Sequence, residues 1–283
     1  MAIISLSSIP PRFDKLAPTL ASLLAQTAPI EEVRLYIPRR FKRFPEYDGA
    51  LPKVAAGVRV IAVEEDFGPA SKVLHAAREL QNGDAPILFC DDDHIYAPQW
   101  AAALLEAHRH HPHACIAGAG CHFGRYARGY RPADKDKRAR YANRRFAPRY
   151  RWARLKQHWQ ERRLRTRGPK PVFQGRVKRA GYTDMLAGHG GALIRPSFVD
   201  GAFYRIPDHL WMDDDIWLSG HLTRKGIPIF QPEGMATPIM TQNNHVAALK
   251  HAFFYGRGQK ASKRHAIAWF QRTYGIWGSA VRA

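Results

Sequence analysis

The sequence has no run of 18 or more apolar residues, so a helix that spans a membrane is not expected. It holds only three cysteines, which are too few and too unevenly spaced for a disulfide framework or a zinc site. The N-terminus has no basic segment followed by a cleavable apolar stretch, and its first residues are typical of a strand instead of a signal peptide. We therefore expect a globular protein of the reducing cytoplasm.

Acidic residues are also scarce, with 24 Asp and Glu against 44 Lys and Arg, a net charge of +20. The excess is concentrated in residues 125–179, which contain 21 Lys or Arg and three acids and so carry +18. Helical spacing in this basic segment places Trp152, Leu155 and Trp159 on one face. Such a helix is typical of anionic membrane surfaces. A solvated insertion whose tryptophans pack on the body is an equal alternative. Nucleic acid ranks third as a partner because no reader motif is present.

Elsewhere, apolar runs alternate with segments of helical periodicity. The expected strands are residues 2–7, 32–38, 58–63, 87–90, 115–118, 192–194 and 226–230, and the expected helices are residues 14–26, 71–81, 98–110 and one near 246–255. This alternation predicts an α/β fold with a mixed, mostly parallel sheet flanked by helices and a basic helical insertion.

The most informative stretch is the apolar run 87–90, which leads directly into Asp91, Asp92 and Asp93. Three adjacent carboxylates at the end of a buried strand are costly unless something positive meets them, and a divalent cation carrying a phosphate is suited to oxygen ligands. Ligands of open α/β sheets bind at this end of the strands. An acidic turn that caps the helix near residue 98 is the alternative.

A second acidic triplet, Asp213, Asp214 and Asp215, runs into residues with helical spacing. The N-terminus of a helix favours acids, but capping explains one aspartate better than three.

These features together resemble a GT-A fold glycosyltransferase, most closely the family 2-type bacterial enzymes and the galactosyltransferases. A βαβ half, a strand ending in Asp-Asp-Asp and a second acidic cluster about 120 residues later carry the resemblance, which covers about residues 1–124 and 181–250 and leaves the basic segment outside. It implies a Rossmann-like GT-A sheet in a single domain, 1–283. The parts of that domain are a nucleotide-sugar half (1–124), the basic insertion (125–179), an acceptor and catalytic half (180–250) and a helical tail (251–283).

The resemblance also implies a function. It indicates a metal-dependent, inverting enzyme that moves a sugar from a nucleoside-diphosphate donor, with UDP favoured, to a hydroxyl of a cell-envelope or polysaccharide glycan. The acceptor would be a glycan or a lipid-linked molecule. The enzyme would be cytoplasmic, with peripheral association at the inner face of the membrane as an open alternative.

Individual roles follow from the matching positions. Asp91 and Asp93 would hold Mn²⁺ or Mg²⁺, with His245 as a further metal ligand and His251 or a structural histidine as alternatives. Asp214 or Asp215 would be the catalytic base, with Asp214 favoured. The donor-binding positions are Ser5, Ser7, Arg12, Asp66, Lys72, Asp91, Asp92, Gly190 and Gly191. For Lys72, a solvent-facing place on its helix is an equal alternative.

Other functions remain open from the residues alone. A nucleotidyltransferase would carry a glycine-rich loop after the first strand, and residues 7–12 lack the glycines. A phosphatase of the haloacid-dehalogenase type would have its acidic pair on the first strand. A membrane- or nucleic-acid-binding protein that acts through the basic segment is the rival without catalysis.

Overall fold

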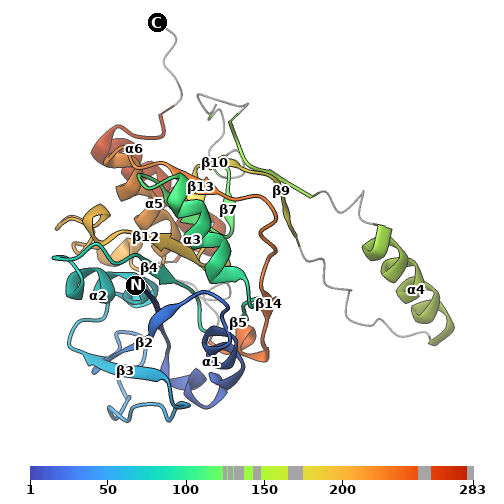
Figure 1. Cartoon of the computed structure of the whole chain (residues 1–283), viewed down its shortest axis with the longest axis horizontal. Helices are drawn as coiled ribbons and strands as arrows, with labels where there is room; N and C mark the ends of the chain where they lie inside the picture. The colour runs from blue at the N-terminus through green and yellow to red at the C-terminus, as the bar shows by residue number, and fades with distance from the viewer. Residues whose placement is uncertain are drawn as a thin grey trace, which may run out of the picture.

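The computed structural model describes residues 1–123, 126, 130, 137–142, 148–164, 175–247 and 256–278. Its centre is an eight-stranded sheet in the order β10-β13-β6-β12-β4-β1-β2-β3 (Figure 1). The strands are β1 (Ala2–Ser7), β2 (Ile30–Pro38), β3 (Val58–Val63), β4 (Ile87–Phe89), β6 (Cys115–Ala117), β10 (Gly181–Thr183), β12 (Ala192–Ile194) and β13 (Ile229–Gln231). β12 runs antiparallel to β4 and β6, β10 runs antiparallel to β13, and the other neighbours are parallel. The expectation of a mixed, mostly parallel sheet is confirmed.

Helices cover both faces of this sheet. They are α1 (Ala17–Leu24), α2 (Ser71–Glu79), α3 (Trp100–His110) and α5 (Asp214–Arg224). α1 and α3 share one apolar cluster with the sheet, and α2 and α5 share the cluster on the other face. The neighbours Ile4 and Ile3 of β1 belong to these two clusters respectively, because successive side chains of a strand point to opposite faces. The result is three layers, helix on sheet on helix.

The helix boundaries depart from the sequence pattern at α1. α1 begins later than expected because the 3₁₀ turn η1 (Pro10–Lys15) comes first, at the consecutive prolines Pro10 and Pro11. A C-terminal helix, α6 (Gln259–Tyr274), lies within the expected helical tail and packs on α5 through a third apolar cluster. Most of the helix expected near 246–255 lies outside the described residues, as does His251.

Three short antiparallel ribbons complete the body. They are β5 (His94–Ile95) with β14 (Ile239–Met240), β7 (Gly120–Cys121) with β11 (Met185–Leu186), and β8 (Arg140–Tyr141) with β9 (Val177–Arg179). Beside the first ribbon, the backbone N–H and the hydroxyl of Thr241 both donate to the carbonyl of Asp93, at 2.9 and 3.0 Å. This ribbon therefore fixes the loop that carries the first acidic triplet.

The basic segment forms a helix, α4 (Pro148–Leu164), that stands apart from the sheet body (Figure 1). Trp152, Leu155 and Trp159 are exposed, so the alternative in which these tryptophans pack on the body is wrong. Over the described ranges, no helix has both the length and the apolar character needed to cross a membrane.

Candidate active site

A cavity of about 730 Å³ opens at the carboxyl ends of the central parallel strands. Ser7, Pro38 and Asp91, which end or follow β1, β2 and β4, line it. Both acidic triplets, 91–93 and 213–215, also line this cavity. Segments that are far apart in the sequence therefore meet at the sheet edge where open α/β folds bind ligands.

Each aspartate of the first triplet has a different partner. Asp91 accepts from the Lys72 ammonium at 2.5 Å, whereas Asp92 accepts from Arg12 and from the Ser8 hydroxyl, each at 2.5 Å. Burial acts to raise the pKa of Asp91, but the Lys72 charge outweighs it and holds the pKa below its usual value. Burial and the neighbouring Asp93 raise the pKa of Asp92 in spite of Arg12. Asp92 is thus tied to Arg12, and Asp91 stays ionised.

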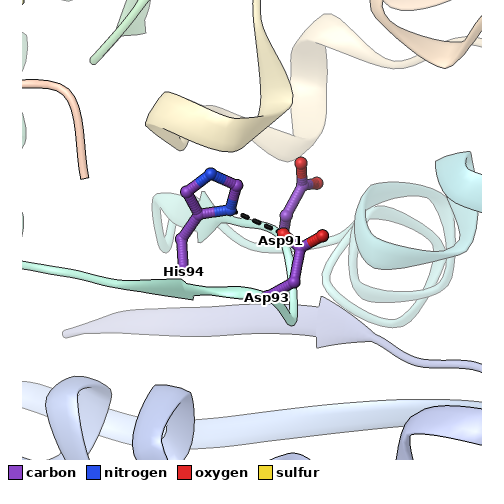
Figure 2. A group of neighbouring side chains, drawn as sticks. All are labelled: Asp91, Asp93 and His94. Carbon is purple, nitrogen blue, oxygen red and sulfur yellow. Dashed lines mark hydrogen bonds and ion pairs between the residues drawn. The ribbon is translucent and has the colours of Figure 1, made fainter. Parts of the chain in front are cut away.

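Asp91, Asp93 and His94 form a compact group of potential metal ligands (Figure 2). One ligand atom from each lies within 4.8 Å of the others, and the His94 Nδ1 is 2.6 Å from an Asp93 oxygen. Two carboxylates and an imidazole suit Mn²⁺, and the carboxylates alone suit Mg²⁺, so these residues fit the expected ion. Arg12 also lies 3.3 Å from Asp93, so a side-chain cation already faces this carboxylate.

His94 is a residue that the sequence reasoning missed, and His245 is in a different place. His245 ends the 3₁₀ turn η8 (Gln242–His245), has an exposed side chain and is not among the residues that line the cavity. The adjacency of His94 to the aspartates was the available signal. His94 begins β5, a two-residue strand that the sequence does not reveal, and its ring lies against Asp93.

Lys72 joins the two acidic triplets. Its buried ammonium lies 2.5 Å from Asp91 and 2.8 Å from Asp214, and the Ser5 hydroxyl donates to its backbone carbonyl at 2.6 Å. Burial opposes the charge, but Asp214 and Asp91 outweigh it and raise the pKa of Lys72 well above its usual value. The solvent-facing alternative for Lys72 is wrong. Ser5, which does not line the cavity, supports the helix turn that presents Lys72.

The second triplet again divides into three environments. Asp213 accepts from the Ser262 hydroxyl of α6, and Asp215 accepts from the backbone N–H of Gly188 at 2.8 Å. Asp214 faces Lys72. Burial, with Asp215 and Asp91 nearby, raises the pKa of Asp214 to about 6 despite Lys72. Asp214 is therefore a carboxylate that can exchange a proton near neutral pH.

The glycines after β11 separate into two roles. A methyl group at Gly188 would lie 2.5 Å from the Lys72 ammonium and 3.1 Å from an Asp91 oxygen, so a side chain there would displace the ammonium. Gly190 and Gly191, expected to line the donor, are absent from the cavity wall as the described residues form it. Added methyls there would strike Ala119 and Trp100, so these two glycines allow close packing.

Asp66 and the aromatic residues define another wall of the cavity. The Asp66 carboxylate accepts from the backbone N–H groups of Lys42 and Gly68, both at 2.8 Å, while Phe41 and Trp211 stand nearby in the lining. These two hydrogen bonds already occupy the carboxylate oxygens of Asp66, and its contact with the nucleotide base stays a prediction.

The N-terminal end of α6 also reaches the cavity, which the sequence pattern did not indicate. Ser262 and Lys263 line it, and Lys263 faces the second triplet. Burial acts to lower the pKa of Lys263, but the charge of Asp215 outweighs burial and the pKa is raised. More than 45 residues separate Lys263 from Asp215, so no local pattern links them.

Comparison with known families decides the relationship. The model of the family described as "Glycosyl transferase family 2" matches residues 12–177, which is more than half of the chain. The chain belongs to glycosyl transferase family 2. The match confirms the resemblance and favours a glycosyltransferase over the rival enzyme and binding functions. It also runs through most of the basic segment, so the expectation that this segment lies outside the family pattern is wrong, and it ends before the second acidic triplet.

The similarity to individual proteins is more distant. Among solved structures, the chain is similar to residues 1–349 of TarS from S. aureus, with 14% identity and a TM-score of 0.44. The alignment covers 86% of this chain and 61% of that one, so the family 2 chain spans less than two thirds of TarS 1–349. No curated protein matches.

Proposed function

We propose that this family 2 protein is a metal-dependent, inverting glycosyltransferase that takes its sugar from a nucleoside diphosphate, with UDP favoured, and delivers it to a hydroxyl of a glycan or a lipid-linked acceptor. The observation that carries the proposal is the position of Lys72, which contacts Asp91 of the metal-ligand group and Asp214 of the second triplet in one cavity. Direct transfer needs both a donor site and a base. Lys72 contacts one residue suited to each role, Asp91 and Asp214, and so brings the two parts of the site together.

Asp91, Asp93 and His94 are the residues that would hold the ion. A bound divalent cation stabilises the negative charge that grows on a leaving diphosphate. The protein's own contribution at this end is positive charge. Lys72 stays protonated between two carboxylates, and Arg12 lies against Asp92 and Asp93, so both cations would be beside a diphosphate bound at these aspartates.

Asp214 is the residue we assign as the base. It accepts the proton of the acceptor hydroxyl while the hydroxyl oxygen forms a bond to the anomeric carbon and the bond from that carbon to the diphosphate oxygen breaks. Attack from the face opposite the leaving group inverts the configuration and needs no covalent intermediate. Asp215, held by Gly188, is a positioning residue that also keeps the pKa of Asp214 high.

Calorimetric titration of UDP and of GDP tests the donor half of this proposal. We expect one nucleotide to bind with Mn²⁺ present and not with EDTA, and we expect Asp93→Asn to abolish that binding. Asp14→Asn, at an exposed aspartate that does not line the cavity, is the matched control and should bind as the unmodified protein does. Absence of binding by either nucleotide in both metal conditions would contradict the proposal.

A further inference from the structure

The apolar stripe of α4 is the most exposed aromatic surface in the described part of the chain. Trp152 and Trp159 are each 70% exposed, and Leu155 between them is 65% exposed. At 100° a residue, the three fall within an arc of about 60°. The chain has seven tryptophans, and Trp100, Trp211, Trp217 and Trp277 are buried in the body. Exposure of tryptophan is therefore specific to this face.

The opposite face of α4 is occupied by its own polar contacts. Gln157, about 140° around the helix from Trp152, is buried and bonds to Arg154 at 2.6 Å and to Glu161 at 2.8 Å. These contacts run along the helix, so polar side chains of α4 itself occupy this face. In Figure 1, α4 also stands clear of the sheet body. The tryptophan face is thus available to a partner.

The charge of α4 indicates the chemistry of that partner. The helix has six Lys or Arg and one acid, Glu161, and so carries +5 before histidine is counted. Lys156 and Arg163 border the apolar stripe on one side and Arg151 and Arg162 on the other, by helical position. Tryptophan and leucine flanked by cations suit the interface of an anionic bilayer, where apolar side chains enter the headgroup boundary and cations meet lipid phosphates.

We propose that α4 lies on the surface of an anionic membrane with Trp152, Leu155 and Trp159 inserted at the headgroup boundary. A nucleic acid would use the cations and stack on tryptophan, but it offers no partner for Leu155, whereas a bilayer accommodates all three side chains. The inference goes beyond the proposed function and does not depend on it, because α4 contributes no residue to the cavity lining.

Co-sedimentation of the full-length protein with lipid vesicles tests the inference. The probes are vesicles of phosphatidylcholine mixed with phosphatidylglycerol and vesicles of phosphatidylcholine alone. We expect binding to the mixed vesicles only, weakened by salt, and a blue shift of tryptophan fluorescence. The double variant Trp152→Ala/Trp159→Ala should bind about tenfold more weakly. Alanine keeps the helix, and circular dichroism verifies this.

A matched pair of leucines provides the control. Leu155→Ala should weaken vesicle binding several-fold, whereas Leu51→Ala, at another exposed leucine of the sheet body, should leave it unchanged. Calorimetric nucleotide binding should be the same in all variants, which separates this test from that of the proposed function. Equal binding to both vesicle types, or unchanged binding by the double variant, would overturn the inference. A dimer that forms only when the tryptophans are present, detected by light scattering, would also overturn it. So would a double variant that loses binding to RNA but keeps its binding to vesicles.

Discussion

The two aspartate triplets of this protein have the same sequence and share Lys72, but their other surroundings differ. Residues 91–93 follow a buried strand and meet cations: Lys72 at Asp91, and Arg12 at Asp92 and Asp93. Residues 213–215 enter α5, where a hydroxyl and a backbone N–H satisfy the two outer aspartates. The first triplet is therefore arranged to concentrate negative charge, whereas in the second the middle residue, Asp214, faces Lys72 and can exchange a proton.

The pKa values express the same difference. Asp91 and Asp214 both contact the Lys72 ammonium, yet the pKa of Asp91 lies below its usual value and that of Asp214 is raised to about 6. Burial acts to raise the pKa of both carboxyls, but the pKa of Asp214 is also raised by the neighbouring carboxylate of Asp215. The comparison shows that a carboxylate's role depends on what surrounds it, and not on the motif that contains it.

Replacing the proposed base should separate the two triplets most clearly. Because only Asp214 moves a proton in the proposed reaction, we expect Asp214→Asn to lower kcat about a thousandfold with nucleotide affinity nearly unchanged. Steady-state kinetics and calorimetry measure the two effects. In the control Asp215→Asn, the amide oxygen can still accept from Gly188, so kcat should fall far less. A greater loss in Asp215→Asn would assign the base to Asp215.

Two histidine variants distinguish the two histidines that are candidate metal ligands. His94 is grouped with Asp91 and Asp93, whereas His245 is exposed and does not line the cavity. We expect His94→Ala to weaken the apparent Mn²⁺ affinity about tenfold to a hundredfold, and His245→Ala to leave it unchanged. Activity measured against Mn²⁺ concentration gives both values. The reverse pattern would restore His245 as the ligand.

Much of this site was predictable because it depends on local sequence. An apolar run that ends in three aspartates fixes both the strand and the acidic loop, and the helical spacing after Asp215 fixes α5. The strand boundaries at residues 2–7 and 58–63 were predicted for the same reason.

The rest depends on contacts between distant segments. Lys72 is ordinary in its helix pattern, and only the packing of α2 against β1 and β4 brings it between Asp91 and Asp214. The approach of Ser262 to Asp213 likewise requires α6 to fold back on α5. The exposure of Trp152 and Trp159 was undecided in the sequence, since the same spacing suits a helix that packs on the body or one that stands apart.

Removing the lysine that links the triplets tests how far they are coupled. Because a base must be deprotonated, activity should fall as the pH drops below about 6, the pKa of Asp214. In Lys72→Met the cation that lowers this pKa is lost, so the pKa rises and the acidic limb moves to higher pH by about one unit. Activity should then be about twofold lower at pH 7 and close to tenfold lower at pH 5, and this pH-dependent loss should recover in more alkaline buffer.

The conservative variant Lys72→Arg keeps the charge and should leave the acidic limb near its original pH. The pH profile of kcat/KM separates an electrostatic role from a merely structural one, since a damaged fold loses activity at every pH. An unmoved limb in Lys72→Met would mean that Asp214 is not the group that titrates, and that the proton leaves through another residue of the second triplet.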